Sequence, residues 1–296
     1  MKTLLTGASG FLGHYLKEKL QNDLLTLGRG ASNSIRCSLD EEIPELPPLD
    51  LVVHNAGWAH RIPKNPEEES KFYQVNLFGT RNLLMGLEKS GRLPNTIVYI
   101  STVAVYGLEK GTNISEKTEP RPLTPYAKSK HEAELLLQGW TFSKGVNLII
   151  LRLPLVAGAK NTPGNLGAMI RGIKNGFYFR IGAGNARKSM VLASDVAALV
   201  PTLLNKKGIF NLTDGDHPTI AQLEKYLGDF YGKRIKTIPD WLLRVAVYLG
   251  DRFPMVPINS YRVAKLSDSL TFDDSKARKE IGWNPSPVIG NLDLTD

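Results

Sequence analysis

Short apolar runs alternate with helical patterns through the first half of the chain. Residues 2–6 form a run typical of a buried strand, and apolar residues then recur at helical spacing from Phe11 to Leu20. Further β-rich runs, separated by helical or turn-rich segments such as 67–89 and 125–143, cover residues 24–27, 35–38, 51–54, 96–100 and 146–151. This alternation predicts right-handed β-α-β crossovers and a parallel sheet, with ligands at the carboxyl ends of its strands.

The alternation of strand and helix patterns becomes less regular after Pro154. Residues 158–184 are rich in Gly and Asn, and residues 239–257 mix aromatic and aliphatic side chains between prolines. A helix over 194–204, capped by Ser194 and started by Asp195, and a strand over 209–212 are expected to return to the main sheet. We therefore assign residues 1–156, joined by 188–213, to one domain, and residues 157–187 and 214–296 to a smaller substrate-binding region.

Composition narrows the classes of protein. The chain has 296 residues, of which 42% are hydrophobic, and its formal net charge is +8. Its Lys and Arg residues are scattered among 29 acidic ones, which disfavours a nucleic-acid partner and leaves attraction of anionic small molecules as one use of the charge. The apolar run from Val146 to Gly158 is interrupted by Arg152 and Pro154, and the start of the chain lacks a signal-peptide pattern, so we expect a cytoplasmic protein without a membrane partner.

Metal sites and disulfides are not expected. Cys37 is the one cysteine, so no internal disulfide can form, and the five histidines show no metal-ligand spacing with it.

A glycine-rich loop separates the first strand from the first helix. The sequence from Thr6 to Gly13 has the spacing G-x-x-G-x-x-G, with Gly7 for a tight turn, Gly10 for close approach of a ligand and Gly13 for close packing of the helix. A pyrophosphate would meet the backbone N–H groups and the helix dipole here. The pattern predicts an α/β dinucleotide domain of the Rossmann type, a doubly wound parallel sheet whose loop contacts come from Gly7, Ser9, Gly10, Phe11, Leu12 and Gly13.

The end of the second strand indicates which cofactor is preferred. An acidic residue there accepts the ribose 2′-hydroxyl of NAD, whereas an Arg suits the 2′-phosphate of NADP. The chain reads Leu27-Gly28-Arg29-Gly30, and the nearest carboxylate, Asp40, follows the third strand. NADP is therefore favoured over NAD, and the alternative is that Arg29 is an ordinary surface residue.

Four Tyr-x-x-x-Lys matches compete for a catalytic role. Tyr106/Lys110 is followed by a loop, Tyr15/Lys19 lies on the helix of the glycine loop, and Tyr261/Lys265 is too far along the chain. Tyr126/Lys130 begins a helix at Pro125 and lies about two dozen residues after Thr102. We therefore choose Tyr126 and Lys130.

With these motifs the chain resembles the extended short-chain dehydrogenase/reductase family, which includes nucleotide-sugar epimerases, dehydratases and ketoreductases. The resemblance covers nearly the whole chain and also rests on Asn55-Ala56-Gly57, Asn76-Leu77-Phe78-Gly79-Thr80, Arg152-Leu153-Pro154 and Ile281-Gly282-Trp283-Asn284-Pro285. It implies that Tyr126 is the acid/base, that Lys130 favours the phenolate and holds the nicotinamide ribose, and that Thr102, rather than Ser101, orients the substrate oxygen. The remaining implied contacts are Asn55, Ala56, Gly57 and Pro154 for the cofactor, and Asn165, Lys188, Arg262 and Lys265, with Thr102, for the substrate.

The resemblance also limits the reaction. Sugar-nucleotide dehydratases carry an Asp-Glu pair where this chain has Val103 and Ala104, so dehydration is disfavoured. The expected function is an NAD(P)-dependent oxidoreductase that acts at C4 of a nucleotide sugar, as a 4-ketoreductase or a 4-epimerase, for example in polysaccharide biosynthesis. A reductase of a non-sugar carbonyl and a non-catalytic dinucleotide sensor are the alternatives.

Asn76 is interpreted as a structural tie in preference to an active-site group. The resemblance to the family also implies a homodimer formed through segments 67–89 and 125–143.

Overall fold

The computed structural model describes residues 1–21, 23–59, 63–158, 162–252, 263 and 267–294. Its main sheet has seven strands, all parallel, in the order β11-β7-β5-β4-β1-β2-β3. From one edge to the other these are β11 (Gly208–Asn211), β7 (Asn147–Leu153), β5 (Thr96–Thr102), β4 (Leu51–His54), β1 (Thr3–Thr6), β2 (Leu24–Gly28) and β3 (Ile35–Arg36). This is the predicted doubly wound α/β fold, and the strand order reverses between β1 and β4.

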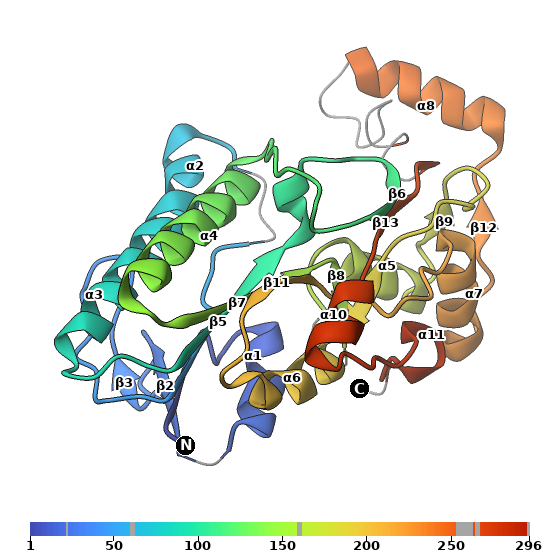
Figure 1. Cartoon of the computed structure of the whole chain (residues 1–296). Helices are drawn as coiled ribbons and strands as arrows, with labels where there is room; N and C mark the ends of the chain where they lie inside the picture. Colours follow the sequence, from blue (N-terminus) through green and yellow to red (C-terminus); the bar gives the residue numbers. More distant parts are fainter. Residues whose placement is uncertain (22, 60–62, 159–161, 253–262, 264–266, 295–296) are drawn as a thin grey trace.

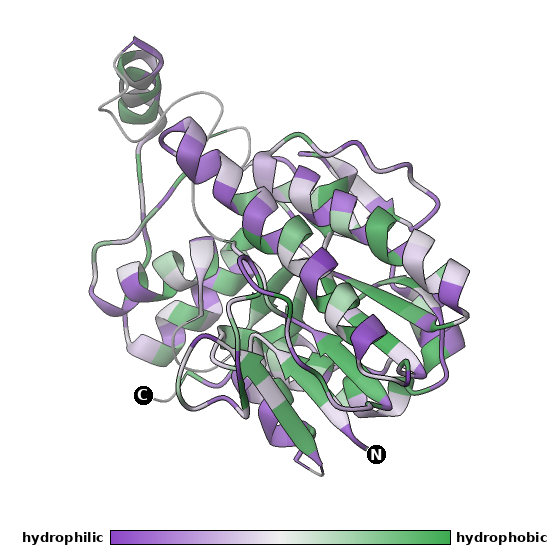
Figure 2. Cartoon of the chain, turned by 90° about the vertical axis from the view of Figure 1, so that its left-hand side faces the viewer, coloured by the Kyte–Doolittle hydropathy of each residue, from purple (hydrophilic) through white to green (hydrophobic). Residues whose placement is uncertain are grey.

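Helices cover both faces of the sheet, as Figure 1 shows. On one face lie α1 (Phe11–Lys19), α6 (Ala193–Leu199) and α10 (Ser275–Ile281); on the other lie α2 (Pro66–Tyr73), α3 (Gly79–Lys89) and α4 (Pro125–Lys144). The central strands β1 and β4 are buried along their whole length. Strands covered on both faces read as continuous apolar runs, and the strands accordingly appear mostly green in Figure 2.

The predicted helix over 67–89 is interrupted in the structure. A π-helical turn, η1 (Gln74–Phe78), joins α2 to α3, and it contains the buried Asn76. A π turn adds a residue to a helical repeat and therefore re-aims the side chains around it, which is why such turns often lie beside functional sites. Helix α4 agrees with its prediction: Pro125 is its first residue, and the Thr124 hydroxyl accepts a hydrogen bond from the Ala127 N–H.

The predicted cap of the later helix is wrong. Helix α6 begins at Ala193, so Ser194 lies inside its first turn, and Leu192 is the capping residue without a side-chain hydrogen bond. Asp195 does lie in the first turn, where its charge suits the helix dipole. Its Oδ2 also accepts a hydrogen bond from the Ser286 N–H at 2.7 Å. The helix gives way to a 3-10 turn, η3 (Val200–Leu203), before β11 joins the main sheet beside β7.

A smaller cluster of elements lies beyond the carboxyl ends of the strands. Its apolar core is formed by side chains from β8, α5, β10, α7 and α11. Among the described residues, the elements outside the main sheet and its covering helices are η2 (Val103–Tyr106), β6 (Gly111–Ile114), β8 (Leu155–Ala157), α5 (Gly164–Lys174), β9 (Phe179–Arg180), β10 (Met190–Leu192), α7 (Ile220–Tyr231), β12 (Lys236–Thr237), α8 (Asp240–Arg252), β13 (Leu270–Phe272) and α11 (Val288–Asn291). Three two-stranded parallel sheets, β10-β8, β12-β9 and β13-β6, pair segments of these elements that are distant in the sequence.

Candidate active site

The glycine loop is closed by contacts that exclude side chains. Gly7 has φ +68°, a conformation that favours glycine, and the Gly10 N–H donates to the Gly7 carbonyl at 3.1 Å. A Cβ on Gly7 would lie 2.7 Å from the Ala56 nitrogen, and one on Gly13 would lie 2.1 Å from the Gly7 oxygen. Both glycines are therefore required by the close approach of neighbouring backbone, as their spacing predicts.

The first helix leaves its N-terminus open to an anion. Gly10 is the capping residue of α1 and supplies no side-chain cap, and Ser9 and Gly10 are exposed at the tip of the loop. Only the backbone of Leu12 can face a ligand at this N-terminus, because its side chain is buried in the core. Backbone N–H groups at the start of a helix and the positive end of its dipole suit a pyrophosphate, so the residues present fit a dinucleotide.

A directional chain of hydrogen bonds holds the β4 loop beside the glycine loop. The Ala56 N–H donates to Thr6 Oγ1, which lies 2.8 Å from His54 Nδ1, and His54 Nε2 lies 2.9 Å from Thr80 Oγ1. Thr80 in turn donates to the Asn76 carbonyl, so its hydroxyl accepts from His54 and the imidazole proton is on Nε2. Burial, and secondarily the charge of Lys130, lower the pKa of His54 to about 3, which keeps the ring neutral.

Asn76 ties the π turn to both neighbouring segments. Its Oδ1 accepts from the Trp58 N–H at 2.7 Å, and its Nδ2 donates to the Ser129 hydroxyl at 2.9 Å. A Cβ on Gly57 would lie 3.2 Å from Asn76 Oδ1 and 3.9 Å from Lys130 Nζ. Asn76 therefore makes the contacts of a structural tie, and Gly57 places the β4 loop directly beside Lys130. Asn55 completes this arrangement, because its Nδ2 donates to the Gly7 carbonyl at 3.0 Å.

Thr102, Tyr126 and Lys130 converge at the carboxyl end of β5. Thr102 is the last residue of β5, and its Oγ1 accepts from the Ala104 N–H at 3.2 Å, which leaves its proton available for donation. Tyr126, in the first turn of α4, is partly buried, and the Thr102 side chain acts to lower the pKa of its phenol. Lys130 lies one turn further, 4% exposed, and its Nζ donates to the Ile100 carbonyl at 2.6 Å and lies 3.9 Å from the centre of the Tyr99 ring.

Burial shifts the two titratable groups in opposite directions. It raises the pKa of Tyr126 to about 12, against the hydrogen bond from Thr102, and it lowers the pKa of Lys130 to about 7, against the attraction of Glu134. The sequence predicts that Lys130 favours the phenolate. In the structure burial is the largest influence on the pKa of Tyr126, and Lys130 Nζ contacts the Ile100 carbonyl and the Tyr99 ring, so the effect of Lys130 on the phenolate stays a prediction. The phenol is accordingly protonated at neutral pH.

A buried ionic network lies behind these residues and was not predicted from the sequence. Ser101 donates to Glu134 Oε1, and Arg152 Nη2 donates to Glu134 Oε2 at 2.6 Å. Burial opposes ionisation of Glu134, but its contacts with His131, Arg152 and Ser101 outweigh burial and hold its pKa below the usual range. The Ser101 hydroxyl is thus occupied, which leaves Thr102 as the hydroxyl next to Tyr126. Glu134 lies four residues after Lys130 on one helix face, which is the signal that could have located it.

The network continues to the second half of the chain. The Arg152 guanidinium lies 4.8 Å from the centre of the Tyr106 ring, and the Tyr106 hydroxyl donates to Asn211 Oδ1 at 2.8 Å. Tyr106 is 1% exposed and is held in this contact, so the structure gives its Tyr-x-x-x-Lys match a packing role. Tyr15 lies on α1, and its hydroxyl is close to Gly158: a Cβ on that glycine would lie 2.6 Å from it.

The other predicted contacts are spread around this edge of the sheet. Pro154 lies between β7 and β8, Arg29 is exposed directly after β2, and Asn165 is exposed in the first turn of α5. Lys188 is partly buried, and its Nζ donates to the Asp268 carbonyl at 2.7 Å. Arg262 and Lys265 lie outside the described residues.

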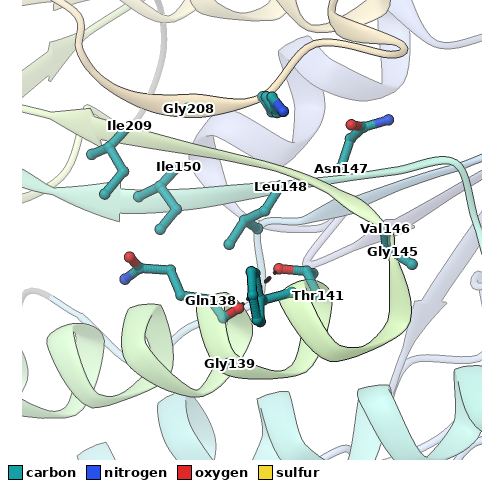
Figure 3. A pocket seen from close by; sticks show the side chains of 12 residues that line it. Gln138, Gly139, Thr141, Gly145, Val146, Asn147, Leu148, Ile150, Gly208 and Ile209 are labelled. Carbon is teal, nitrogen blue, oxygen red and sulfur yellow. Dashed lines mark hydrogen bonds between the residues drawn. The ribbon is translucent and has the colours of Figure 1, made fainter.

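A hollow elsewhere on the surface is separate from this site. Figure 3 shows it between the last turns of α4 and the strands β7 and β11, with Gln138, Leu148 and Ile209 among its lining residues. Gln138 lies twelve residues after Tyr126 on α4, a separation of roughly 18 Å along a helix. The hollow is therefore too far away to serve the Tyr126 hydroxyl.

Comparisons with known proteins agree with this fold. The profile of the NAD dependent epimerase/dehydratase family matches residues 3–213. The N-acetyl-alpha-D-glucosaminyl-diphospho-ditrans,octacis-undecaprenol 4-epimerase of Escherichia coli O157:H7 is 29% identical, with 99% of this chain and 93% of that protein covered. The GDP-6-deoxy-D-mannose reductase of Pseudomonas aeruginosa is 28% identical, with 81% and 83% covered. The solved structure of UDP-glucose 4-epimerase from Thermotoga maritima with UDP-glucose has a TM-score of 0.72 at 22% identity, with 96% of this chain and 94% of that chain covered.

Proposed function

Because the chain belongs to the NAD dependent epimerase/dehydratase family, we propose that it acts at C4 of a diphosphate-linked sugar, as a 4-ketoreductase or a 4-epimerase. Membership confirms the resemblance seen in the sequence and establishes an enzyme with a nicotinamide dinucleotide cofactor. The observation that carries the proposal is the placement of Thr102 at the end of β5 and of Tyr126 and Lys130 in the first turns of α4, next to the open glycine loop. A sensor without catalysis would not need this assembly.

Proton transfer is the part of the reaction that the chain's own residues perform. When bound, the nicotinamide supplies or accepts the hydride. Tyr126, protonated at neutral pH, gives its proton to a carbonyl oxygen, and in the reverse direction it takes one from an alcohol. Thr102 donates a hydrogen bond to the same oxygen and fixes its position. Val103 and Ala104, in η2 directly after Thr102, offer no carboxyl group for elimination of water.

Thr102→Val should lower kcat by about a hundredfold, because the donor to the reacting oxygen is removed while the shape is kept. Ser101→Ala is the matched control: its hydroxyl donates to Glu134, so its loss should reduce stability by about 1 kcal/mol with little change in rate. Steady-state kinetics of both variants distinguishes the two hydroxyls. A wild-type rate for Thr102→Val would transfer the role to Ser101.

The cofactor preference rests on Arg29. The guanidinium is exposed directly beyond β2, and the Asp40 carboxylate accepts a hydrogen bond from Ser38 at 2.8 Å. We propose NADP, with Arg29 pairing with the 2′-phosphate. Arg29→Ala should then weaken NADPH binding roughly 10- to 100-fold and leave NADH binding nearly unchanged. Fluorescence titration measures both, with the exposed Arg81→Ala as control, and equal losses for the two cofactors would contradict the assignment.

The nucleotide carried by the purified protein separates the two reactions. An epimerase keeps its cofactor and returns the hydride to the opposite face of the sugar, so tightly held NAD would identify one. A reductase exchanges its cofactor at each turnover, so an empty site that prefers NADPH would identify the other. Arg29 favours the reductase. A protein that neither carries nor binds a nicotinamide dinucleotide would contradict both.

There are two candidates for the group to which the diphosphate of the sugar substrate is attached. A nucleoside diphosphate is the first, with Asn165, Lys188, Arg262 and Lys265 proposed around it; Lys188 would have to give up the Asp268 carbonyl. A polyprenyl diphosphate is the second, because the Escherichia coli relative that aligns over almost the whole chain is named for that substrate. Both present a sugar diphosphate to the same catalytic residues, and turnover of each substrate class distinguishes them.

We also propose a cytoplasmic homodimer. Met85 on α3 and Leu135 on α4 are 39% and 54% exposed, on the two helical segments from which the family suggests a dimer. Apolar side chains on adjacent exposed helices suit an isologous contact. Light scattering of the purified chain tests this, and a monomer at all concentrations would contradict it.

A further inference from the structure

Helix α8 carries an exposed apolar stripe that the proposed function does not use. Its members are Trp241, Leu242, Val245, Tyr248 and Leu249, which are 68%, 44%, 49%, 62% and 40% exposed. At about 100° per residue these five positions fall within a band about 120° wide, so they form one continuous surface along the helix. Scattered exposed apolar residues are ordinary, but a contiguous aromatic and aliphatic stripe marks an interaction site.

The stripe faces away from the rest of the protein. Leu243 and Val247, which are only partly exposed, lie on the opposite side of the helix from the stripe. Figures 1 and 2, which differ by a quarter turn, both show α8 standing off from the body of the molecule. The five stripe residues are therefore on the more exposed side of the helix, where a partner can reach them.

Positive charge predominates in the segment that leads into α8 and continues onto the helix. Within residues 233–252 there are five Lys and Arg residues and two carboxylates, Asp240 and Asp251. Lys233, Arg234 and Lys236, in the segment that leads into α8, are exposed, as are Arg244 and Arg252 on the helix. The Arg252 guanidinium lies 5.9 Å from the centre of the Tyr248 ring, at the end of the stripe. An exposed apolar helix face that follows a basic segment complements an anionic, apolar surface.

We propose that α8 and the basic segment before it dock the protein on an anionic lipid bilayer. Trp and Tyr favour the boundary between head groups and acyl chains, and Lys and Arg are attracted to anionic head groups. The helix has 13 residues, which at 1.5 Å each gives roughly 20 Å, too short to cross about 30 Å of hydrocarbon. It therefore lies in the plane of the surface.

This surface changes the expectation drawn from the sequence, which considered only segments that cross a membrane. No helix among the described residues is long and apolar enough to do so. An interfacial helix needs no such length, because only one of its faces enters the lipid. In Figure 1, α8 stands at the same end of the molecule as the first turn of α4, which carries Tyr126. Docking would hold the active site near sugar diphosphates attached to lipid.

Vesicle sedimentation tests the docking surface without any need for turnover. The purified chain should bind vesicles of phosphatidylglycerol mixed with phosphatidylcholine, bind pure phosphatidylcholine less, and be released by salt. Trp241→Ala/Tyr248→Ala should weaken binding at least tenfold, whereas Trp241→Phe/Tyr248→Phe should retain it. Lys233→Gln/Arg234→Gln should weaken binding to the anionic vesicles alone. The matched charge control, Lys206→Gln/Lys207→Gln, removes two exposed lysines before β11 and should change nothing.

Two results would overturn the proposal. One is failure of the wild-type chain to bind the anionic vesicles. The other is unchanged binding by Trp241→Ala/Tyr248→Ala, with cofactor affinity and thermal unfolding like those of the wild type. If that variant instead abolishes self-association in light scattering while vesicles are never bound, the stripe is a contact between two copies of the chain. Each outcome is independent of whether the enzyme reduces or epimerises its sugar.

Discussion

Tyr126→Phe is expected to lower kcat by about a thousandfold while leaving the dissociation constant of the cofactor nearly unchanged. The substitution removes only the hydroxyl that Thr102 contacts, and the ring keeps its packing against Phe72, whose centre lies 6.1 Å away. No other hydroxyl takes over, because that of Ser101 is bonded to Glu134. Single-turnover kinetics reports the chemical step, and fluorescence titration reports cofactor binding.

Tyr106→Phe is the matched control, because Tyr106 also begins a Tyr-x-x-x-Lys match and its hydroxyl is bonded to Asn211. Its loss leaves a buried amide oxygen without that partner and should cost about 1–2 kcal/mol of stability with little effect on the chemical step. Retained turnover in Tyr126→Phe would remove Tyr126 from the mechanism. Equal rate losses in Tyr126→Phe and Tyr106→Phe would indicate that each hydroxyl supports the structure, and that the loss in Tyr126→Phe is not evidence for proton transfer.

Glu134→Gln is expected to lower the free energy of unfolding by about 3 kcal/mol at neutral pH, because it leaves the Arg152 guanidinium buried without its counter-charge. Both side chains are almost fully buried, so solvent does not screen the loss. The folded-state pKa of Glu134 is lowered, so its contribution is complete above the usual carboxyl pKa and is lost as pH falls through the lowered value. The difference between variant and wild type should therefore shrink in acid. Urea denaturation across pH measures it.

Two variants calibrate this loss. Glu132→Gln changes an exposed carboxylate on the same helix and should alter stability by less than about 0.5 kcal/mol. Glu134→Met/Arg152→Met removes both charges and should be less destabilising than Glu134→Gln, because no buried charge is left unpaired. If Glu134→Gln were as stable as the wild type, the pair would not support the fold behind the active site.

The parallel sheet could be predicted because each central strand is buried on both faces and is therefore a continuous apolar run in the sequence, and because glycines and prolines mark the loops between strands and helices. The close packing behind Gly7 and Gly13 follows from their spacing, as does the helix start at Pro125. Features that depend on contacts distant in the sequence were missed. The π turn at Asn76 is stabilised by Trp58 and Ser129, and Asp195 accepts from the Ser286 N–H in the folded chain.

The site divides in the same way. Thr102, Tyr126 and Lys130 could be chosen by spacing, since β5 and α4 each present them at one end. The occupation of Ser101 by Glu134 could not, because 33 residues separate them and only the fold brings them together. The apolar face of α8 was visible as an aromatic and aliphatic stretch between prolines, but which residues turn outward depends on how the helix meets the body.

The central claim is that this site transfers hydride to a sugar carbon while Tyr126 moves the proton. The most direct measurement loads the protein with reduced cofactor that carries deuterium at the transferring position of the nicotinamide, and adds a nucleoside-diphospho-4-keto sugar. We predict that NMR of the product will show deuterium at C4 of the sugar with the wild-type chain and none with Tyr126→Phe. Wild-type protein that binds the cofactor but leaves both it and the 4-keto sugar unchanged would contradict the account.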